Sequence, residues 1–324
     1  MHYARAFVVA ASFTCGARRR VPLATTSISH NFMTMSQYTR SDDETNTTIE
    51  ELLQRAQVVR QDICGDETVA PSFIQQHQQL AIPYSSYEMK IDEGRLKLPK
   101  KSTSSVKRGF CNWLIPNRIM IGQYPGMTPE LTGCSAKESQ IHIQNMVQVA
   151  NINQFCCLQT EVPAQDYDSE WEASGGEVYL DSFSRREFPR PFTRYGPLAQ
   201  TFSESTLTFV HSPIEDLGTP SCNNSLLCLL SNLLEHLESD SSNTIYLHCW
   251  GGRGRAGLIG GLLGSLLFPE LTSQQILAWV QGGYDTRAGA KAMHLGLRKS
   301  PQTEQQRQFV QEFVALVTEA KGKL

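Results

Sequence analysis

Short apolar runs alternate with segments of helical periodicity over the last two thirds of the chain. Four runs have the length and composition of buried strands: RIMIG at 118–122, QFCCLQ at 154–159, TLTFVHSPI at 206–214 and TIYLHC at 244–249. Apolar residues recur at helical spacing in two of the intervening segments, 139–150 and 223–237. This alternation predicts an α/β domain with a central, mostly parallel sheet flanked by helices on both faces.

The C-terminal part of the chain has a helical pattern throughout. The strongly apolar segment GLIGGLLGSLLF at 257–268 comes first. A second helix is predicted in TSQQILAWVQGGY, where Thr272 has the residue type and position of an N-cap. A third is predicted in PQTEQQRQFVQEFVALVTEA with Pro301 at its start, since proline favours the first turn of a helix.

Residues 42–104 are polar and rich in glutamine, and they read as a tethered extension before the main domain. One amphipathic helix is expected in TIEELLQRAQVVRQDI at 48–63. Its apolar residues share one face: Ile49, Leu52, Leu53, Ala56 and Val59. The basic, serine-rich segment KLPKKSTSSVKRG at 97–109 has the composition of a linker. We therefore predict the main domain at 105–324.

Residues 1–41 contain several arginines and many hydroxyl residues but no acidic residue. That composition is typical of an organelle transit segment, which predicts a flexible targeting segment for a mitochondrion or plastid. The apolar run AFVVAASF precedes the arginine cluster, whereas in a secretory signal the positive residues come first. The alternative is an untargeted flexible tail on a cytoplasmic protein.

Overall charge and cysteine usage exclude several classes of function. The 324 residues carry a formal net charge of −3, so neither nucleic acid nor an anionic membrane is the expected partner. No run approaches the roughly 18 apolar residues of a membrane span. The nine cysteines lack the paired spacing of a metal site, and we expect mostly buried, reduced thiols without a metal or other cofactor. The oligomeric state is not indicated.

The segment YLHCWGGRGRAG at 246–257 carries the strongest chemical signal. Cys249 ends an apolar strand, and a glycine-rich loop separates it from an apolar helix. Glycines let backbone N–H groups converge on one point, and the positive end of the helix dipole adds to their field, which favours a phosphate dianion and a thiolate. Arg255 can return its planar guanidinium to the same point. These features predict that Cys249 is a nucleophile for phosphorus.

HCWGGRGRAG resembles the signature loop of the cysteine-dependent protein tyrosine and dual-specificity phosphatase superfamily. DLGTP at 216–220 resembles the acid loop of that family, SPQTEQQ at 300–306 its glutamine loop, and NWLIPNRIMIGQYP at 112–125 its entry strand. The resemblance covers about residues 108 to 320.

The resemblance implies a role for each matching residue. Cys249 would form a phosphocysteine, Asp216 would be the general acid, and Arg255 would bind the phosphoryl oxygens. Gln302 and Gln306 would position the attacking water. The residues expected to bind substrate in the loop are His248, Trp250, Gly251, Gly252, Arg253 and Gly254.

Several alternatives remain open for individual residues. Glu215 could be the acid instead of Asp216, and either could cap the helix that starts near Asn223. Trp250 could stack on a substrate or cover the core. Arg253 could bind a substrate phosphate or pair with a surface carboxylate. Cys156 and Cys157 could protect an oxidised Cys249 by a disulfide, although adjacent thiols in a strand usually pack.

The leading functional hypothesis is a phosphoprotein phosphatase of dual-specificity or tyrosine type. A phosphoinositide or phosphoglucan phosphatase of the same superfamily is one alternative, which the basic Arg253 favours. A phosphate-binding pseudophosphatase is the other, because Ala256 stands where the family usually has a serine or threonine hydroxyl. That departure predicts slow breakdown of a phosphocysteine.

Overall fold

The computed structural model describes part of the chain and places that part in one unit, Met35–Leu324. The described residues are 47–65, 111–126, 136–174, 177–178, 192–287, 290 and 298–324. The predicted targeting segment 1–41 and the basic linker at 97–109 lie outside them. No helix among the described residues has both the length and the apolar character needed to cross a membrane.

A five-stranded sheet lies at the centre of the described part of the chain. In spatial order its strands are β1 (Cys111–Ile115), β2 (Ile119–Gln123), β7 (Ile245–Cys249), β3 (Gln154–Gln159) and β6 (Thr208–Ile214). Only β1 and β2 pair in antiparallel orientation; the other three pairings are parallel. This confirms the predicted mostly parallel sheet. A separate antiparallel pair joins β4 (Glu177–Val178) to β5 (Phe192–Thr193).

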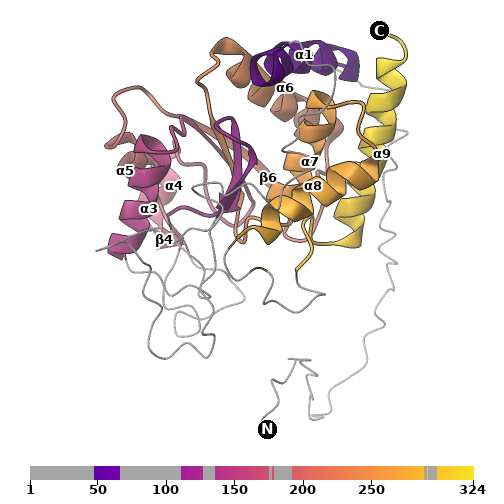
Figure 1. Cartoon of the computed structure of the whole chain (residues 1–324). Helices are drawn as coiled ribbons and strands as arrows, with labels where there is room; N and C mark the ends of the chain where they lie inside the picture. The colour runs from indigo at the N-terminus through magenta and orange to yellow at the C-terminus, as the bar shows by residue number, and fades with distance from the viewer. Residues whose placement is uncertain are drawn as a thin grey trace, which may run out of the picture. The chain divides into compact units, whose positions relative to one another are not determined.

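Helices cover both faces of the sheet (Figure 1). On one side, five helices share a single hydrophobic cluster with the strands: α1 (Ile49–Cys64), α6 (Asn223–Ser239), α7 (Arg255–Leu267), α8 (Ser273–Asp285) and α9 (Glu304–Lys321). The other face carries a second cluster rich in aromatic residues, with α3 (Ala136–Gln148), α4 (Asp168–Ala173) and α5 (Gly196–Gln200) on its side. The predicted α/β class with flanking helices is confirmed.

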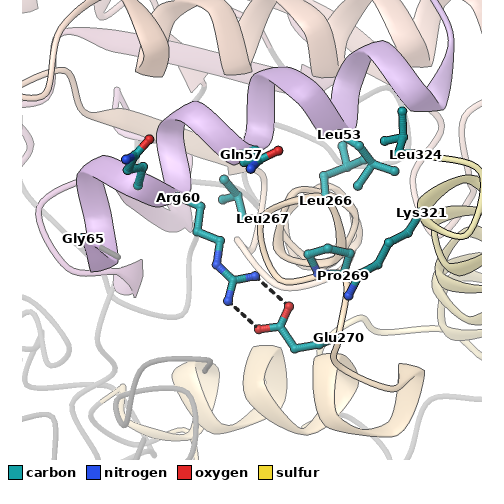
Figure 2. Close-up of a pocket in the computed structure, with 11 residues that line it drawn as sticks. Leu53, Gln57, Arg60, Gly65, Leu266, Leu267, Pro269, Glu270, Lys321 and Leu324 are labelled. Atoms are coloured by element: carbon teal, nitrogen blue, oxygen red, sulfur yellow. Dashed lines mark hydrogen bonds and ion pairs between the residues drawn. The ribbon is translucent and has the colours of Figure 1, made fainter. Parts of the chain in front are cut away.

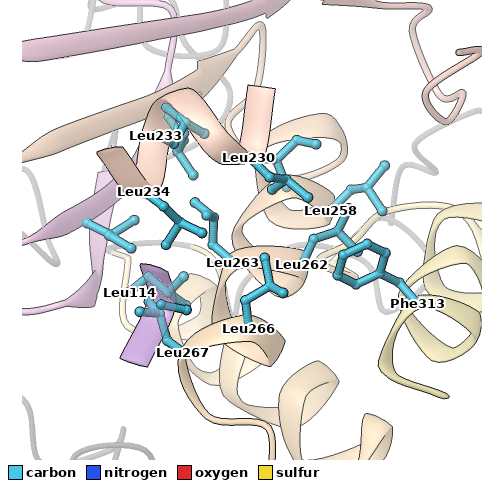
Figure 3. Close-up of a cluster of buried hydrophobic side chains, with 14 of the residues drawn as sticks. Leu114, Leu230, Leu233, Leu234, Leu258, Leu262, Leu263, Leu266, Leu267 and Phe313 are labelled. Atoms are coloured by element: carbon cyan, nitrogen blue, oxygen red, sulfur yellow. The ribbon is translucent and has the colours of Figure 1, made fainter. Parts of the chain in front are cut away.

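Helix α7 is the centre of the larger core. Every residue of α7 is buried, as expected for a helix that is apolar on all sides. Figure 3 shows its leucines, Leu262 and Leu266 among them, between leucines of α6 and Phe313 of α9. Because α7 starts at the end of the Cys249 loop, this packing fixes the position of the loop on its helical side.

The N-terminal helix belongs to the same core. Thr48 forms a capping box with Glu51, and Leu52, Leu53, Ala56 and Val59 are buried, which confirms the predicted helix and its face. The helix contacts α6, α7 and α9. The domain boundary at residue 105 stays a prediction, but α1 shares the hydrophobic core of the residues that follow rather than standing apart as a tethered element.

A cavity of about 610 Å³ lies beside α1 (Figure 2). Leu53 and Leu267 line its apolar part, and Lys321 of α9 lies at its edge. Arg60 pairs with both carboxylate oxygens of Glu270 at 2.7 and 2.9 Å. None of the lining residues belongs to the Cys249 loop.

The predicted helix starts are correct for α8 and wrong by three residues for α9. Thr272 caps α8 as expected. Helix α9 begins at Glu304 rather than at Pro301, because Thr303 is its N-cap and forms a capping box with Gln306. Pro301 lies before that cap.

Candidate active site

Cys249 is the last residue of β7, at the carboxyl edge of the parallel strands, and its side chain is buried. The loop 250–254 then turns directly into α7. Gly252 has φ 65°, and a Cβ atom at this position would lie 2.1 Å from the carbonyl carbon of Gly122. Only glycine fits such a turn against the end of β2. The sequence CWGGRGR thus forms a tight strand-to-helix loop, as its glycines predict.

The carbonyl groups of this loop are held by donors outside it. Trp250 O accepts from the Tyr124 amide at 3.3 Å, and Arg253 O accepts from Ser300 Oγ at 2.9 Å. The amides of the loop glycines and of Arg253 donate no hydrogen bond to the described residues. A loop with occupied carbonyls and unused amides at a helix N-terminus has the electrostatics of an anion site.

Arg287 supports the loop, and no motif of the sequence points to it. It donates to Gly252 O at 2.7 Å and, more weakly, to Gly251 O at 3.4 Å. The same guanidinium donates to Asn112 Oδ1 at 2.8 Å and Ile121 O at 3.0 Å. Burial lowers its pKa from the usual value. Arg287 therefore ties the loop to strands β1 and β2.

Arg255 is almost completely buried, with 1% of its side chain exposed. Glu161 accepts from Nη1 at 2.7 Å and from Nη2 at 2.9 Å, and Ile214 O accepts from Nη1 at 3.0 Å. Burial lowers the pKa of Arg255, but the hydrogen bonds to Glu161 and the nearby Cys249 and Asp216 raise it, and the net shift is upward. The guanidinium is therefore a fixed cation.

Glu161 is a functional candidate that the sequence analysis missed. It lies two residues beyond the end of β3, and β3 is the parallel neighbour of β7. The carboxyl ends of parallel strands meet at one edge of a sheet, so an acid just after β3 is expected near the residues that follow Cys249. Strand order, rather than sequence spacing, carries that information.

Asp216 follows β6 and reaches the same guanidinium. Its Oδ1 lies 3.1 Å from Arg255 Nη2, and its side chain is half exposed. Glu215 forms no ion pair with the described residues. Cys222 is the N-cap of α6 and makes no side-chain capping bond, so neither acid caps that helix. Of the two acids considered, Asp216 is the one that lies at the loop arginine.

The segment 216–220 lies against the start of α9. Leu217 adopts φ 64° and its carbonyl accepts from Thr303 Oγ1 at 3.2 Å. Gly218 O accepts from Gln306 Nε2 at 2.8 Å. The segment that carries Asp216 is thus connected to the segment that carries the two glutamines.

The two glutamines border the Cys249 loop. Gln302 Oε1 accepts from Arg253 Nε at 3.2 Å. Gln306 is fully buried, and its Oε1 accepts from the amides of Gln302 and Thr303 at 3.0 and 3.2 Å. A Cβ atom on Gly254 would lie within 3.4 Å of both side-chain oxygens. Gln306 also donates a hydrogen bond to Gly218 of the segment 216–220. Its hydrogen bonds therefore give it a structural role that the sequence did not indicate.

His248 supports the loop from the opposite face of β7. It is fully buried, and its Nε2 shares a 2.6 Å hydrogen bond with the Tyr195 hydroxyl. Burial lowers the pKa of His248 well below its usual value, so the imidazole is neutral at pH 7. Trp250 packs edge-to-face on Phe192, with ring centroids 6.2 Å apart, and joins the aromatic cluster. Trp250 therefore covers the core.

Cys156 and Cys157 are buried free thiols of β3. Burial raises the pKa of both, that of Cys157 to about 12. Neither forms a disulfide. Cys156 belongs to the hydrophobic cluster on one face of the sheet and Cys157 to the cluster on the other face.

The chain is weakly similar in structure to solved structures of other proteins. No protein-family model and no curated protein sequence matches the chain. The crystal structure of PTPMT1 is similar with 9% identity and a TM-score of 0.38 over 66% of this chain and 100% of that chain. A kinase-associated phosphatase whose catalytic-site cysteine is replaced by serine shows 15% identity and a TM-score of 0.40 over 65% of this chain and 96% of that chain. Both scores lie below 0.5.

Proposed function

We propose that the chain is a phosphatase that hydrolyses phosphomonoesters through a phosphocysteine at Cys249. The observation that carries the proposal is the set of unused loop amides around the end of β7, next to the fixed cation Arg255. Amides and a guanidinium in this arrangement bind a phosphoryl group and stabilise the charge that develops on its oxygens.

The chemistry requires a nucleophile, an acid and a water. The Cys249 thiolate attacks phosphorus, which forms the S–P bond and breaks the P–O bond of the ester, while Asp216 gives its proton to the leaving oxygen. Water then attacks phosphorus and loses a proton to the Asp216 carboxylate. The S–P bond breaks, phosphate leaves and the thiolate is regenerated. Gln302 is positioned beside the loop to orient that water.

The Asp216–Arg255 ion pair must change during this cycle. A bound phosphate dianion competes with the Asp216 carboxylate for Nη2 of Arg255. Glu161 holds the other edge of the guanidinium and can stay in place. Substrate binding therefore releases Asp216 from the arginine. The freed carboxylate takes up a proton from water and then gives it to the leaving oxygen, while Glu161 keeps the arginine oriented.

A phosphorylated protein is the substrate we favour, and a polyanionic substrate such as a phosphoinositide or phosphoglucan is the second candidate. Arg253 favours the second candidate, because it forms no salt bridge with a carboxylate of the described residues and bonds instead to neutral Gln302. Its charge is thus available to a further anionic group.

The test is an assay of the full-length protein against a phosphotyrosine peptide, a phosphoserine peptide, phosphoinositides and a phosphoglucan. Phosphate release by the wild type and none by Cys249→Ser is the expected result, and the preferred substrate identifies the subtype. Phosphate binding without release from any substrate would support a pseudophosphatase, which is the reading that Ala256 favours.

A further inference from the structure

Gln123 ends β2 directly beside the point where Cys249 ends β7. The two residues are partners in the register of parallel β2 and β7, so their side chains leave the sheet on the same face. Ile121, two residues before Gln123, and Cys249 both belong to the cluster on the α7 side. The Gln123 side chain therefore lies on the α7 side, next to the Cys249 side chain.

Helix α7 and the loop enclose this position. A Cβ atom on Gly260 would lie 2.5 Å from Ile121 Cδ1, so this face of α7 rests on β2. Ala256 lies one helical turn before Gly260, on the same face of α7. Gln123 lies two residues after Ile121, on the same face of β2. Because α7 starts at the edge where the strands end, Ala256 comes to lie over Gln123. Gly252 of the loop packs on the backbone of β2 at this point, since its Cβ would meet the backbone nitrogen of Gln123 at 2.5 Å.

The side-chain amide of Gln123 is unused in this enclosure. The residue is buried, and Oε1 has no hydrogen-bond partner. No hydrogen bond of its Nε2 to the described residues is present either, whereas its backbone carbonyl accepts from the Tyr246 hydroxyl at 2.6 Å. Oε1 is thus the buried end of the amide, whereas Nε2 is neither fully buried nor bonded to a described residue and can donate to a group that comes to lie beside it.

We propose that Gln123 donates a hydrogen bond from Nε2 to the Cys249 sulfur, and that it acts mainly when the sulfur leaves phosphorus as a thiolate. The inference rests on the proposed function. A departing thiolate is stabilised by a nearby donor, and the methyl group of Ala256 cannot be one. Gln123 is the polar side chain that the register places beside the sulfur. The oxygen end of the amide then faces away from the thiolate, since only the N–H end attracts it.

The test is a rapid-quench measurement of p-nitrophenyl phosphate turnover by full-length Gln123→Met, which keeps the side-chain length and removes the donor. We expect the linear phase, which reports phosphocysteine breakdown, to fall about 10- to 100-fold, with the burst rate changed by less than about threefold. Phosphocysteine should accumulate in acid-quenched samples. Gln154→Met is the matched control, because Gln154 is buried at the opposite end of the sheet.

A second variant separates a donor role from a packing role. Ala256→Ser places a hydroxyl over the same position and should restore most of the linear rate in Gln123→Met, while changing the wild type much less. An unchanged linear rate in Gln123→Met, or an equal loss of both phases that Ala256→Ser does not rescue, would overturn the inference. Absence of both p-nitrophenol release and acid-trapped phosphocysteine in the wild type would instead contradict the proposed function.

Discussion

The orientation of Arg255 depends on Glu161, which makes Glu161→Ala the most informative single substitution. The carboxylate holds two guanidinium nitrogens at 2.7 and 2.9 Å, and the arginine side chain is 1% exposed. Removing one partner of a buried ion pair costs about 3–5 kcal/mol. Asp216 and the Ile214 carbonyl still contact the guanidinium, and Glu161 is itself 17% exposed. We therefore expect a loss at or below the lower limit of that range, about 2–3 kcal/mol of unfolding free energy.

Activity should fall by more than this loss of stability explains. Without Glu161 the guanidinium keeps only Asp216 and a carbonyl, and Asp216 is the group that has to leave it when substrate binds. A poorly oriented arginine costs about 100-fold in kcat/KM. Glu161→Gln keeps one acceptor oxygen but brings an N–H donor against the guanidinium, so it should recover little of that loss.

Urea unfolding and initial rates with p-nitrophenyl phosphate measure the two effects. Glu235→Ala is the matched control, because Glu235 is an exposed acid of α6 that forms no ion pair with the described residues. If Glu161→Ala unfolds at the wild-type urea midpoint and retains wild-type kcat/KM, the ion pair neither stabilises the fold nor orients Arg255, and the reasoning is refuted.

Three further predictions concern the core, the loop and pH. Leu52→Ala should lower the unfolding free energy by about 2–5 kcal/mol in urea melts, with kcat unchanged, whereas exposed Val58→Ala should have little effect; equal melts would exclude α1 from the core. Gly252→Ala should abolish phosphate release while the protein stays folded by circular dichroism, because its Cβ would clash with β2; normal activity would contradict the loop geometry. His142 has a pKa of about 3 in the fold through burial, against about 6.5 when unfolded. Between pH 7 and 5 only the unfolded chain gains this proton, so the unfolding free energy should decrease as the pH is lowered, by at most about 1.4 kcal/mol per pH unit from this group. In urea melts His142→Phe should show a smaller decrease over the same pH range. An equal decrease in the variant and the wild type would refute the assignment.

The elements that the sequence could predict are those with local signals. Apolar runs and helical periodicity are enough to place β3, β7 and α6, and Thr272 marks the start of α8 by its own side chain. The start of α9 differs from the predicted one. Pro301 and Thr303 both favour a helix start, and only the capping box with Gln306 decides between them. Likewise, the apolar face of α1 is visible in the sequence, but what it packs against is not, since the helices it contacts begin more than 150 positions later.

The residues around Cys249 also divide into those with a local sequence signal and those without one. Cys249 and Arg255 are six positions apart, so their proximity follows from one loop. Arg287, Glu161 and Gln123 come from three separate segments, and nothing in their local sequence distinguishes them from surface residues. Glu161 and Gln123 become predictable only from strand order: β2 and β3 flank β7 in parallel, so a residue that ends or follows those strands must lie at the edge where Cys249 ends. Arg287 follows α8, and its contact with the loop is seen only in the folded structure. A sequence from which the order β2-β7-β3 can be inferred therefore already indicates which distant acid holds the arginine and which amide lies beside the thiol.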